Sequence, residues 1–234
     1  AGTGSAWTIG DDISGSATLR LGADNQIPDA AILQLASNGS LDLNGNDENF
    51  TTLAMEVGPL GGSQFNIGSG GAAVVNLNTT VHTLGGGNGS GASISGGTLG
   101  LSLFNASGAA LQRTLIVNDG ASGVDLNISS AIVDGTGFQS GGLIKNGFGT
   151  LQLSGGGANT FTGTTTVNEG TLELNKTAGV NALSGPLTVG DGSLQSGGMG
   201  SDAVVWLQSN QIPDYNAAVI VGGTGLLNLN GRSE

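Results

Sequence analysis

The segment of residues 142–175, GLIKNGFGTLQLSGGGANTFTGTTTVNEGTLELN, constrains the fold more than any other part of the chain. It contains three short runs, 150–153, 164–167 and 171–174, in which apolar and polar residues alternate. Such alternation puts one side of a β-strand in a core and the other side in solvent. The phrase Gly-Thr-Leu-x-Leu starts at Gly149 and again at Gly170, 21 residues later. This spacing predicts a parallel β-helix in which the two phrases stack on successive coils.

The same segment resembles the passenger-associated transport repeat of bacterial autotransporter-type surface proteins. The family pattern is roughly Leu-x-Lys-x-Gly-x-Gly-Thr-Leu-x-Leu-Ser-Gly, then Asn-Thr-(aromatic)-Thr-Gly-x-Thr-x-Val, then Gly-Thr-Leu, and nearly every position is filled here. The residues that carry the motif are Gly149, Thr150, Leu151, Leu153, Gly163, Thr164, Val167, Gly170, Thr171, Leu172 and Leu174. The resemblance implies a non-catalytic passenger or stalk segment of a large secreted protein, located outside the cell or on the bacterial outer-membrane surface.

Composition supports an all-β chain. The sequence has 46 glycines in 234 residues and only 9% charged residues. The glycines do not follow a Gly-X-Y register, which excludes collagen, and the recurring apolar runs argue against disorder. We therefore predict one elongated domain over residues 1–234, without helices of ordinary length. Further strands are expected at 31–35, 64–67, 74–77, 99–103, 115–117, 124–128, 187–189, 204–207 and 219–221.

The predicted architecture is a right-handed parallel β-helix, or β-solenoid. Coils of roughly 20 residues, spaced by about 4.8 Å, would give about 11–12 coils. Each coil needs its neighbours to cover its apolar face, so stability is expected to come from stacking. The glycine-rich stretch 85–97 has few core residues, and we expect it to form a loop outside the rod or a weak point in it.

A long internal repeat is the second strong feature of the sequence. Residues 16–29 return at 201–214, 185 positions later, with the pentapeptide Asn-Gln-Ile-Pro-Asp in both copies. The phrase Leu41–Gly45 returns at 227–231, offset by 186, so the repeated unit covers 16–45 and 201–231. Proline and the flanking Asn and Asp predict a corner in the pentapeptide. We interpret the chain as a segment of a longer repetitive protein, whose neighbouring repeats would be its first partners.

Charge and residue usage exclude several function classes. The formal net charge is −12, and the five basic residues are scattered along the sequence, which disfavours nucleic acid as a partner. No apolar run is long enough to cross a membrane, and the first ten residues do not form a signal peptide. Cysteine is absent, so disulfides and thiolate metal sites are excluded.

Candidate catalytic and metal-binding residues are few. His82 is the only histidine, and the adjacent acids are limited to Asp11-Asp12 and Asp47-Glu48. Neighbours on a strand point to opposite faces, so these pairs do not predict a polysaccharide-cleaving site. Residues 197–205 match one calcium-binding nonapeptide, with Asp202 as the ligand, but such sites need tandem copies. We therefore expect no enzyme, no cofactor and no metal, with calcium at Asp202 as a weak candidate.

Three functions remain open from the sequence. The first is a structural stalk that supports export and display or adhesion. The second is a glycan-binding or fibre-forming adhesin module, with homotypic contacts through ends or edges. The third is a β-helix polysaccharide lyase or hydrolase.

Overall fold

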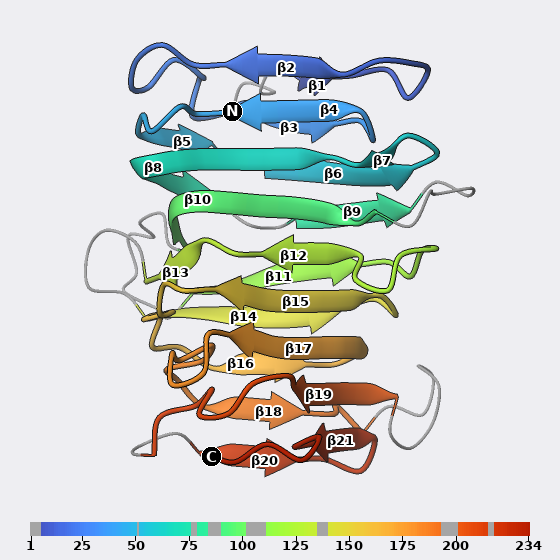
Figure 1. Cartoon of the computed structure of the whole chain (residues 1–234), viewed down its shortest axis with the longest axis vertical. Helices are drawn as coiled ribbons and strands as arrows, with labels where there is room; N and C mark the ends of the chain where they lie inside the picture. Colours follow the sequence, from blue (N-terminus) through green and yellow to red (C-terminus); the bar gives the residue numbers. More distant parts are fainter. Residues whose placement is uncertain are drawn as a thin grey trace.

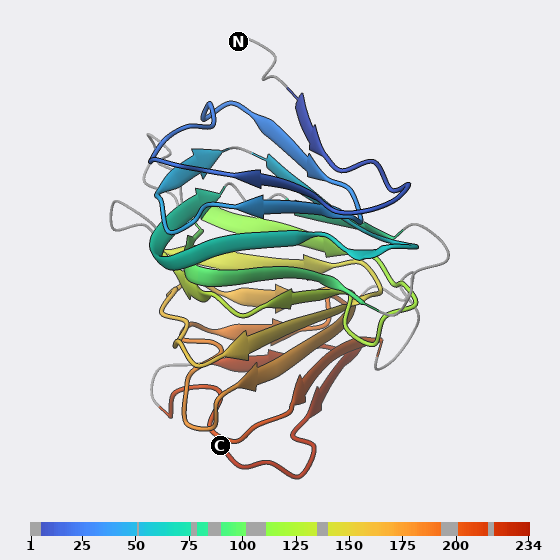
Figure 2. The same ribbon diagram turned by 45° about the horizontal axis from the view of Figure 1, so that its top comes forward.

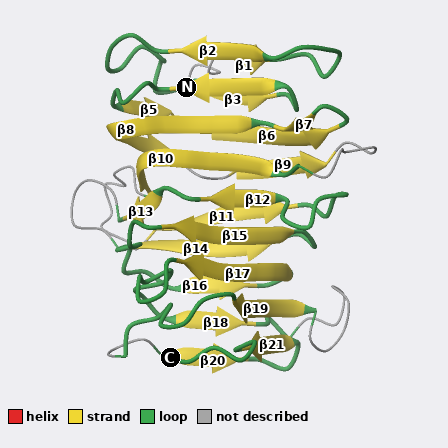
Figure 3. Ribbon diagram, in the orientation of Figure 1, coloured by secondary structure: helices red, strands yellow, loops and turns green. Residues whose placement is uncertain are grey.

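A computed structural model describes residues 6–50, 52–75, 79–83, 90–101, 111–134, 140–192, 201–214 and 218–234. Within these ranges the chain contains strands, turns and bends but no helix, which confirms the all-β prediction (Figure 3). No helix that could cross a membrane occurs in the described part of the chain.

The strands form two large sheets. The first, sheet A, contains β1 (Ala6–Ile9), β3 (Ile32–Leu35), β6 (Thr52–Gly58), β7 (Gly61–Gly62), β9 (Thr79–Thr83), β11 (Leu111–Val117), β14 (Gly141–Asn146), β16 (Thr165–Val167), β18 (Leu187–Val189) and β20 (Val219–Val221). The second, sheet B, contains β2 (Ala17–Arg20), β4 (Gly39–Asp42), β5 (Glu48–Phe50), β8 (Gln64–Val75), β10 (Ala92–Gly100), β12 (Leu126–Ile128), β13 (Ala131–Val133), β15 (Thr150–Gly155), β17 (Gly170–Lys176), β19 (Asp202–Trp206) and β21 (Gly225–Asn228).

The chain alternates between the two sheets as it proceeds, and strands of successive coils pair in parallel. In Figure 1 the strands β2, β4, β12 and β15 lie in front with their arrows to the left, while β6, β9 and β14 lie behind with their arrows to the right. The chain descends from the amino terminus as it circulates, which is a right-handed winding. The blue strands β1 and β2 and the red strands β20 and β21 lie at opposite ends of the long axis (Figure 2). This is the arrangement of a parallel β-solenoid.

The number of coils is smaller than predicted. The main path through each sheet holds nine strands, so the described residues make nine coils rather than 11–12. The reason is that the coils differ in the number of residues that they contain. Ile32 pairs with Thr52, which is 20 positions later, but Thr79 pairs with Leu115, which is 36 positions later.

The predicted strands are largely present. The runs at 187–189 and 219–221 coincide with β18 and β20. The motif runs at 150–153 and 171–174 lie in β15 and β17, and the run at 164–167 matches β16 except for its first residue. The loop expected at 85–97 is wrong for residues 92–97, which belong to β10, and β10 pairs with β8 and β12. Residues 84–89 and the distal parts of the strands predicted at 74–77 and 99–103 lie outside the described residues.

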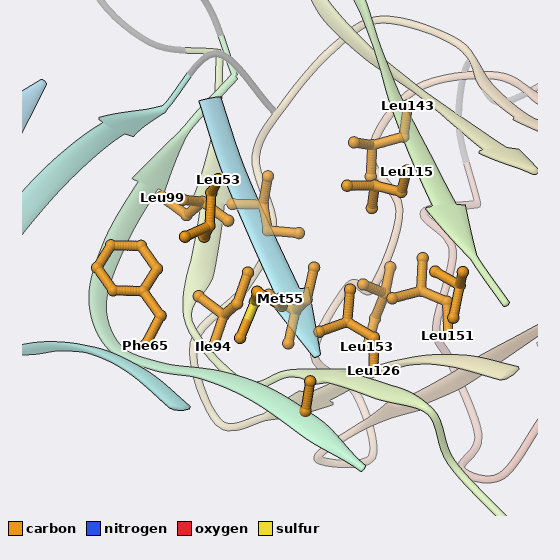
Figure 4. Packing of buried hydrophobic residues seen from close by; sticks show 14 of the residues in the cluster. Leu53, Met55, Phe65, Ile94, Leu99, Leu115, Leu126, Leu143, Leu151 and Leu153 are labelled. Carbon is orange, nitrogen blue, oxygen red and sulfur yellow. The ribbon is translucent and has the colours of Figure 1, made fainter. Parts of the chain in front are cut away.

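The core between the sheets is built from columns of apolar side chains, one residue from each coil. One column of sheet B runs through Leu19, Leu41, Phe65, Ile94, Ile128, Leu153, Leu174 and Trp206. All of these except the partly buried Leu19 are buried. Figure 4 shows how leucines from both sheets meet in this core.

Two local features interrupt the regular coil. Strands β8 and β10 are long and irregular in register near Gly68 and Gly96, and their distal halves pair with β5 and β13 in a short third ladder. Both glycines have positive φ, a conformation that a side chain disfavours. The second feature is the β6–β7 hairpin, an antiparallel pair among described strands that otherwise pair in parallel, whose turn contains Pro59.

Candidate functional site

The segment 142–175 forms two adjacent coils of the solenoid. Strands β15 and β17 place Thr150 beside Thr171, Leu151 beside Leu172 and Leu153 beside Leu174. The stacking of the two Gly-Thr-Leu-x-Leu phrases is therefore confirmed. The four leucines are buried, as is Val167 on the opposite sheet.

The glycines and threonines of the motif lie where coils approach each other closely. A Cβ atom at Gly163 would lie 2.4 Å from the Gly141 carbonyl oxygen, and at Gly170, which has positive φ, it would lie 2.5 Å from the Gly147 carbonyl oxygen. Gly149 and Thr164 both offer their carbonyl oxygens to amides, those of Thr171 and Leu143. These contacts fix the distance between coils rather than forming a cavity.

Lys145 is the residue of this segment that the sequence analysis missed. Its strand β14 pairs Lys145 with Leu115 on one side and Val167 on the other, which puts the lysine in an inward column. The side chain is 1% exposed. Lys145 shares its strand phase with Leu143, so the alternation Leu-Ile-Lys held the signal for its inward position.

The ammonium group of Lys145 bonds three backbone carbonyl oxygens. Nζ donates to Gly147 at 2.6 Å, to Glu169 at 3.0 Å and to Asn146 at 3.2 Å. In return, the Glu169 carboxylate accepts a bond from the Gly147 amide at 2.6 Å. The pair thus joins the turn after β14 to the turn before β17, one coil further on.

Three acids surround Lys145 electrostatically. Burial lowers the pKa of Lys145 to about 8, and the carboxylates of Glu169, Asp125 and Asp202 oppose this shift. Asp125 is buried, which raises the pKa of its carboxyl, and its two oxygens accept bonds from the Gly120 amide at 2.9 Å and the Thr150 amide at 2.8 Å. Asp125 therefore holds the first threonine of the motif from the preceding coil.

Asp202, the weak calcium candidate, is buried between Gly170 and Gly225 in the sheet B ladder. Its Oδ1 accepts a bond from the Ser201 hydroxyl at 3.0 Å, and its Oδ2 has no hydrogen-bond partner among the described residues. No group of three or more His, Cys, Asp or Glu side chains that could hold a metal occurs in the ranges that the structure describes. Residues 197–200 of the nonapeptide lie outside those ranges. The absence of a metal site stays a prediction.

Lys176 is a second buried lysine at the end of the motif. Its Nζ donates to the Ser130 carbonyl oxygen at 3.0 Å, and burial lowers its pKa to about 8. The Gln211 side chain, from the second Asn-Gln-Ile-Pro-Asp copy, bonds the backbone amide of Lys176 at 2.8 Å and its carbonyl at 3.3 Å. The pentapeptide and the motif are therefore in direct contact, which sequence spacing did not indicate.

The acids that would serve an enzyme bond backbone amides of neighbouring turns. Asp12 accepts from the Ser37 amide at 2.6 Å, and Asp47 from the Ala72 amide at 2.9 Å. Glu48 is buried and accepts from the amides of Gln26 at 2.8 Å and Ile27 at 2.9 Å. Each of these bonds joins different coils. The backbone of His82 lies in β9, and its side chain is outside the described set.

Three of the five basic residues are buried. Lys145, Lys176 and Arg113 lie inside, and the Arg113 guanidinium donates to the Leu101 carbonyl oxygen at 2.5 Å. Arg20 is paired with Asp42 at 3.3 Å on the surface, and Arg232 is exposed. The solvent-facing surface is therefore poorer in cations than the sequence suggests, which further weakens a phosphate-binding interpretation.

Part of the chain is similar to a known family of repeats. Residues 143–174 match the family model described as the passenger-associated-transport-repeat. No curated protein and no solved structure matches the chain. The matched residues are those of the Lys145–Glu169 coil junction and the two stacked leucine phrases.

Proposed function

We propose that this segment is a non-catalytic structural rod within a larger secreted bacterial surface protein, where it supports export and displays other parts of the chain. One observation carries the proposal: several of the charged groups that could serve chemistry are used to join coils. Lys145 with Glu169, Asp125 with Thr150, and Glu48 with Gln26 are the clearest cases. The match at residues 143–174 supports the placement in a passenger segment.

Stacking of coils also supplies a mechanism for one-way export. Each coil that folds on the outer side buries apolar surface at about 25 cal/mol per Å², so return through the membrane would require unfolding it again. The bond from Lys145 to the Glu169 carbonyl oxygen and the bond from the Gly147 amide to the Glu169 carboxylate form only when both coils are in place, which makes stacking cooperative between neighbours.

The export role is tested by displaying an epitope tag on a bacterial surface through this segment. Replacing Leu151 and Leu172 by Asp buries unpaired charge in adjacent coils and should sharply reduce the amount of displayed tag. The matched control is Thr166→Ala on the outward side of β16, which should leave display unchanged. Equal display by all three chains would contradict the export role.

The proposal that the segment is not an enzyme is tested separately. Incubation of the purified chain with a panel of polysaccharides should release no new reducing ends and no unsaturated products. Sustained product release that disappears on substitution of an acid would overturn the proposal in favour of a lyase or hydrolase.

A glycan-binding role is the second candidate, and one groove favours it. The outward residues Thr18, Ser40 and Gln64 stand in one column of sheet B. They line a groove of about 410 Å³ together with Ser16, Asn38 and Ser90. Hydroxyl and amide groups of this kind bond sugar hydroxyls. Titration calorimetry with surface glycans, using Gln64→Ala as the variant, should show binding that the variant loses if this role is real.

A further inference from the structure

The second copy of the internal repeat reproduces the first in structure as well as in sequence. Asn44 and Asn230 both have positive φ, 55° and 50°. The side-chain amide of Asn44 donates to Leu21 at 3.4 Å, and that of Asn230 donates to Trp206 at 3.2 Å. The residues 218–234 therefore form the same coil as residues 32–48, one repeat later.

The equivalence extends three residues beyond the repeat found in the sequence. Glu48 accepts bonds from the amides of Gln26 and Ile27, and Glu234 accepts bonds from the amides of Gln211 at 2.9 Å and Ile212 at 3.2 Å. Glu234 also accepts a bond from the Trp206 indole. Each acid fixes the Asn-Gln-Ile-Pro-Asp turn of the preceding coil, so Glu234 occupies the position of Glu48.

The two copies differ in what covers them. In the first copy, Leu33, Leu35 and Leu43 are fully buried beneath β6 and β8. The equivalent residues of the second copy are Val219, Val221 and Leu229, which are 43%, 46% and 43% exposed. Beside them lies a hollow of about 230 Å³, lined by Trp206, Ile212 and Leu227 among others. We call this face, formed by Val219, Val221, Leu227 and Leu229, the terminal seat.

We propose that the terminal seat binds one further coil of the type formed by residues 49–75, in parallel and in the register of the first copy. That coil would place the counterparts of Leu53 and Met55 over Val219 and Val221. The counterpart of Phe65 would lie over Leu227, because Phe65 pairs with Leu41 in the first copy. In this proposal, the last coil of the repeat determines which inward positions of the next coil must carry apolar side chains.

This inference deepens the structural role proposed above and rests on it. It is tested by adding a second copy of residues 49–75 directly after Glu234, which keeps the spacing found after Glu48. The added coil should raise the Tm by at least about 4 °C and lower the binding of a hydrophobic dye, because apolar surface is removed from water. Amide exchange at Val219–Val221 should slow at least tenfold.

The matched control carries an added copy in which each inward side chain is exchanged for its outward neighbour. In that copy the counterparts of Leu53 and Ala54 change places, as do those of Phe65 and Asn66, while the original residues 49–75 are unchanged. Composition and length are unchanged, but the apolar face points to solvent. This control should give no rise in Tm and no slowing of exchange. An equal effect of both chains, or no effect of the correct chain, would overturn the proposal.

Two further outcomes separate this inference from the structural role itself. If the unmodified chain forms head-to-tail assemblies that the added coil does not suppress, the seat is not specific for this coil and the inference fails. If the inference fails while the unmodified chain still supports display and shows no polysaccharide cleavage, the structural role stands. Loss of display in the unmodified chain would instead contradict the proposed function.

Discussion

Lys145 and Lys176 are both buried, but the groups around their ammonium nitrogens differ. The ammonium group of Lys145 donates to three carbonyl oxygens and is attracted by three nearby carboxylates. That of Lys176 donates to a single carbonyl oxygen among the described residues. Removal of a buried charge lowers the free energy of unfolding most when it leaves several buried partners without a hydrogen bond or an opposite charge, and least when few partners are left. The two lysines should therefore respond differently to the same substitution.

We expect Lys145→Met to lower the free energy of unfolding at pH 7 by about 2–4 kcal/mol, because three carbonyls and the nearby acids lose their partner. Lys176→Met should be neutral or slightly stabilising, because methionine fills the same space without a buried charge. Urea unfolding followed by circular dichroism measures both. Similar losses of stability in the two variants would contradict the difference between the two environments.

The same lysines set a pH dependence. Their folded-state pKa values of about 8 lie below the ordinary value of 10.5, so the unfolded chain binds more protons between these two pH values. The free energy of unfolding should therefore rise with pH between about 8 and 10.5, by up to ~3 kcal/mol per lysine, and be insensitive to these groups below pH 8. Unfolding measured across this window should show a slope that becomes smaller in each Met variant. A flat profile for the unsubstituted chain would contradict the burial of both amines.

The sequence contained part of this residue-scale information. Lys145 lies two positions after Leu143 on the same strand, so its side chain could have been predicted to point inward. Extending the alignment of the two repeat copies by three residues would have matched Glu48 with Glu234. The contact between Gln211 and Lys176 could not have been predicted, because these residues are 35 positions apart and meet only through coil stacking.

At the scale of the element, the turn at Asn25–Asp29 depends on an acid from the next coil. Glu48→Ala removes the bonds that a buried carboxylate accepts from the Gln26 and Ile27 amides of this turn, together with one from the Asn49 amide, and should cost about 2–3 kcal/mol. Amide exchange at Gln26 and Ile27 should accelerate far more than exchange in β15. The control is Glu173→Ala, whose carboxylate accepts a bond from the Gln152 side chain on the outer face and should cost under about 1 kcal/mol. A uniform change in exchange along the chain would contradict a local clamp.

Strand positions were predictable where alternation is strong, as in β18 and β20. The prediction missed β10, where the alternation Ala-Ser-Ile-Ser is only four residues long, contains a single large apolar side chain, Ile94, and is followed by two glycines. That segment becomes a strand because β8 and β12 offer backbone partners on both sides. Local composition does not contain this information.

At the scale of the whole molecule, the apolar columns imply that energetic coupling falls with coil separation. Leu153 and Leu174 are neighbours in one column, whereas Leu41 lies several coils away. Each Leu→Ala substitution should cost about 2–5 kcal/mol. The pair Leu41 and Leu174 should add within about 0.5 kcal/mol, and the pair Leu153 and Leu174 should depart from additivity by more. Double-mutant cycles measured by urea unfolding test this, and strong coupling of the distant pair would argue against nearest-neighbour stability.

The overall architecture followed from the sequence, but the number of coils did not. Strand patterns specify which residues stack, while the number of residues per coil varies from 20 between Ile32 and Thr52 to 36 between Thr79 and Leu115. No local signal reports how many residues a turn will hold before the next strand begins.

The variable turns have a consequence for the reach of the molecule. Spacing along the axis is set by strand pairing at about 4.8 Å per coil, whatever the number of residues that the coil contains. The coil that joins Thr79 to Leu115 therefore extends the rod no further than the shorter one that joins Ile32 to Thr52. The length of the rod therefore depends on the number of coils and not on the number of residues. Residues inserted at a corner change the surface that the rod displays without changing how far it extends.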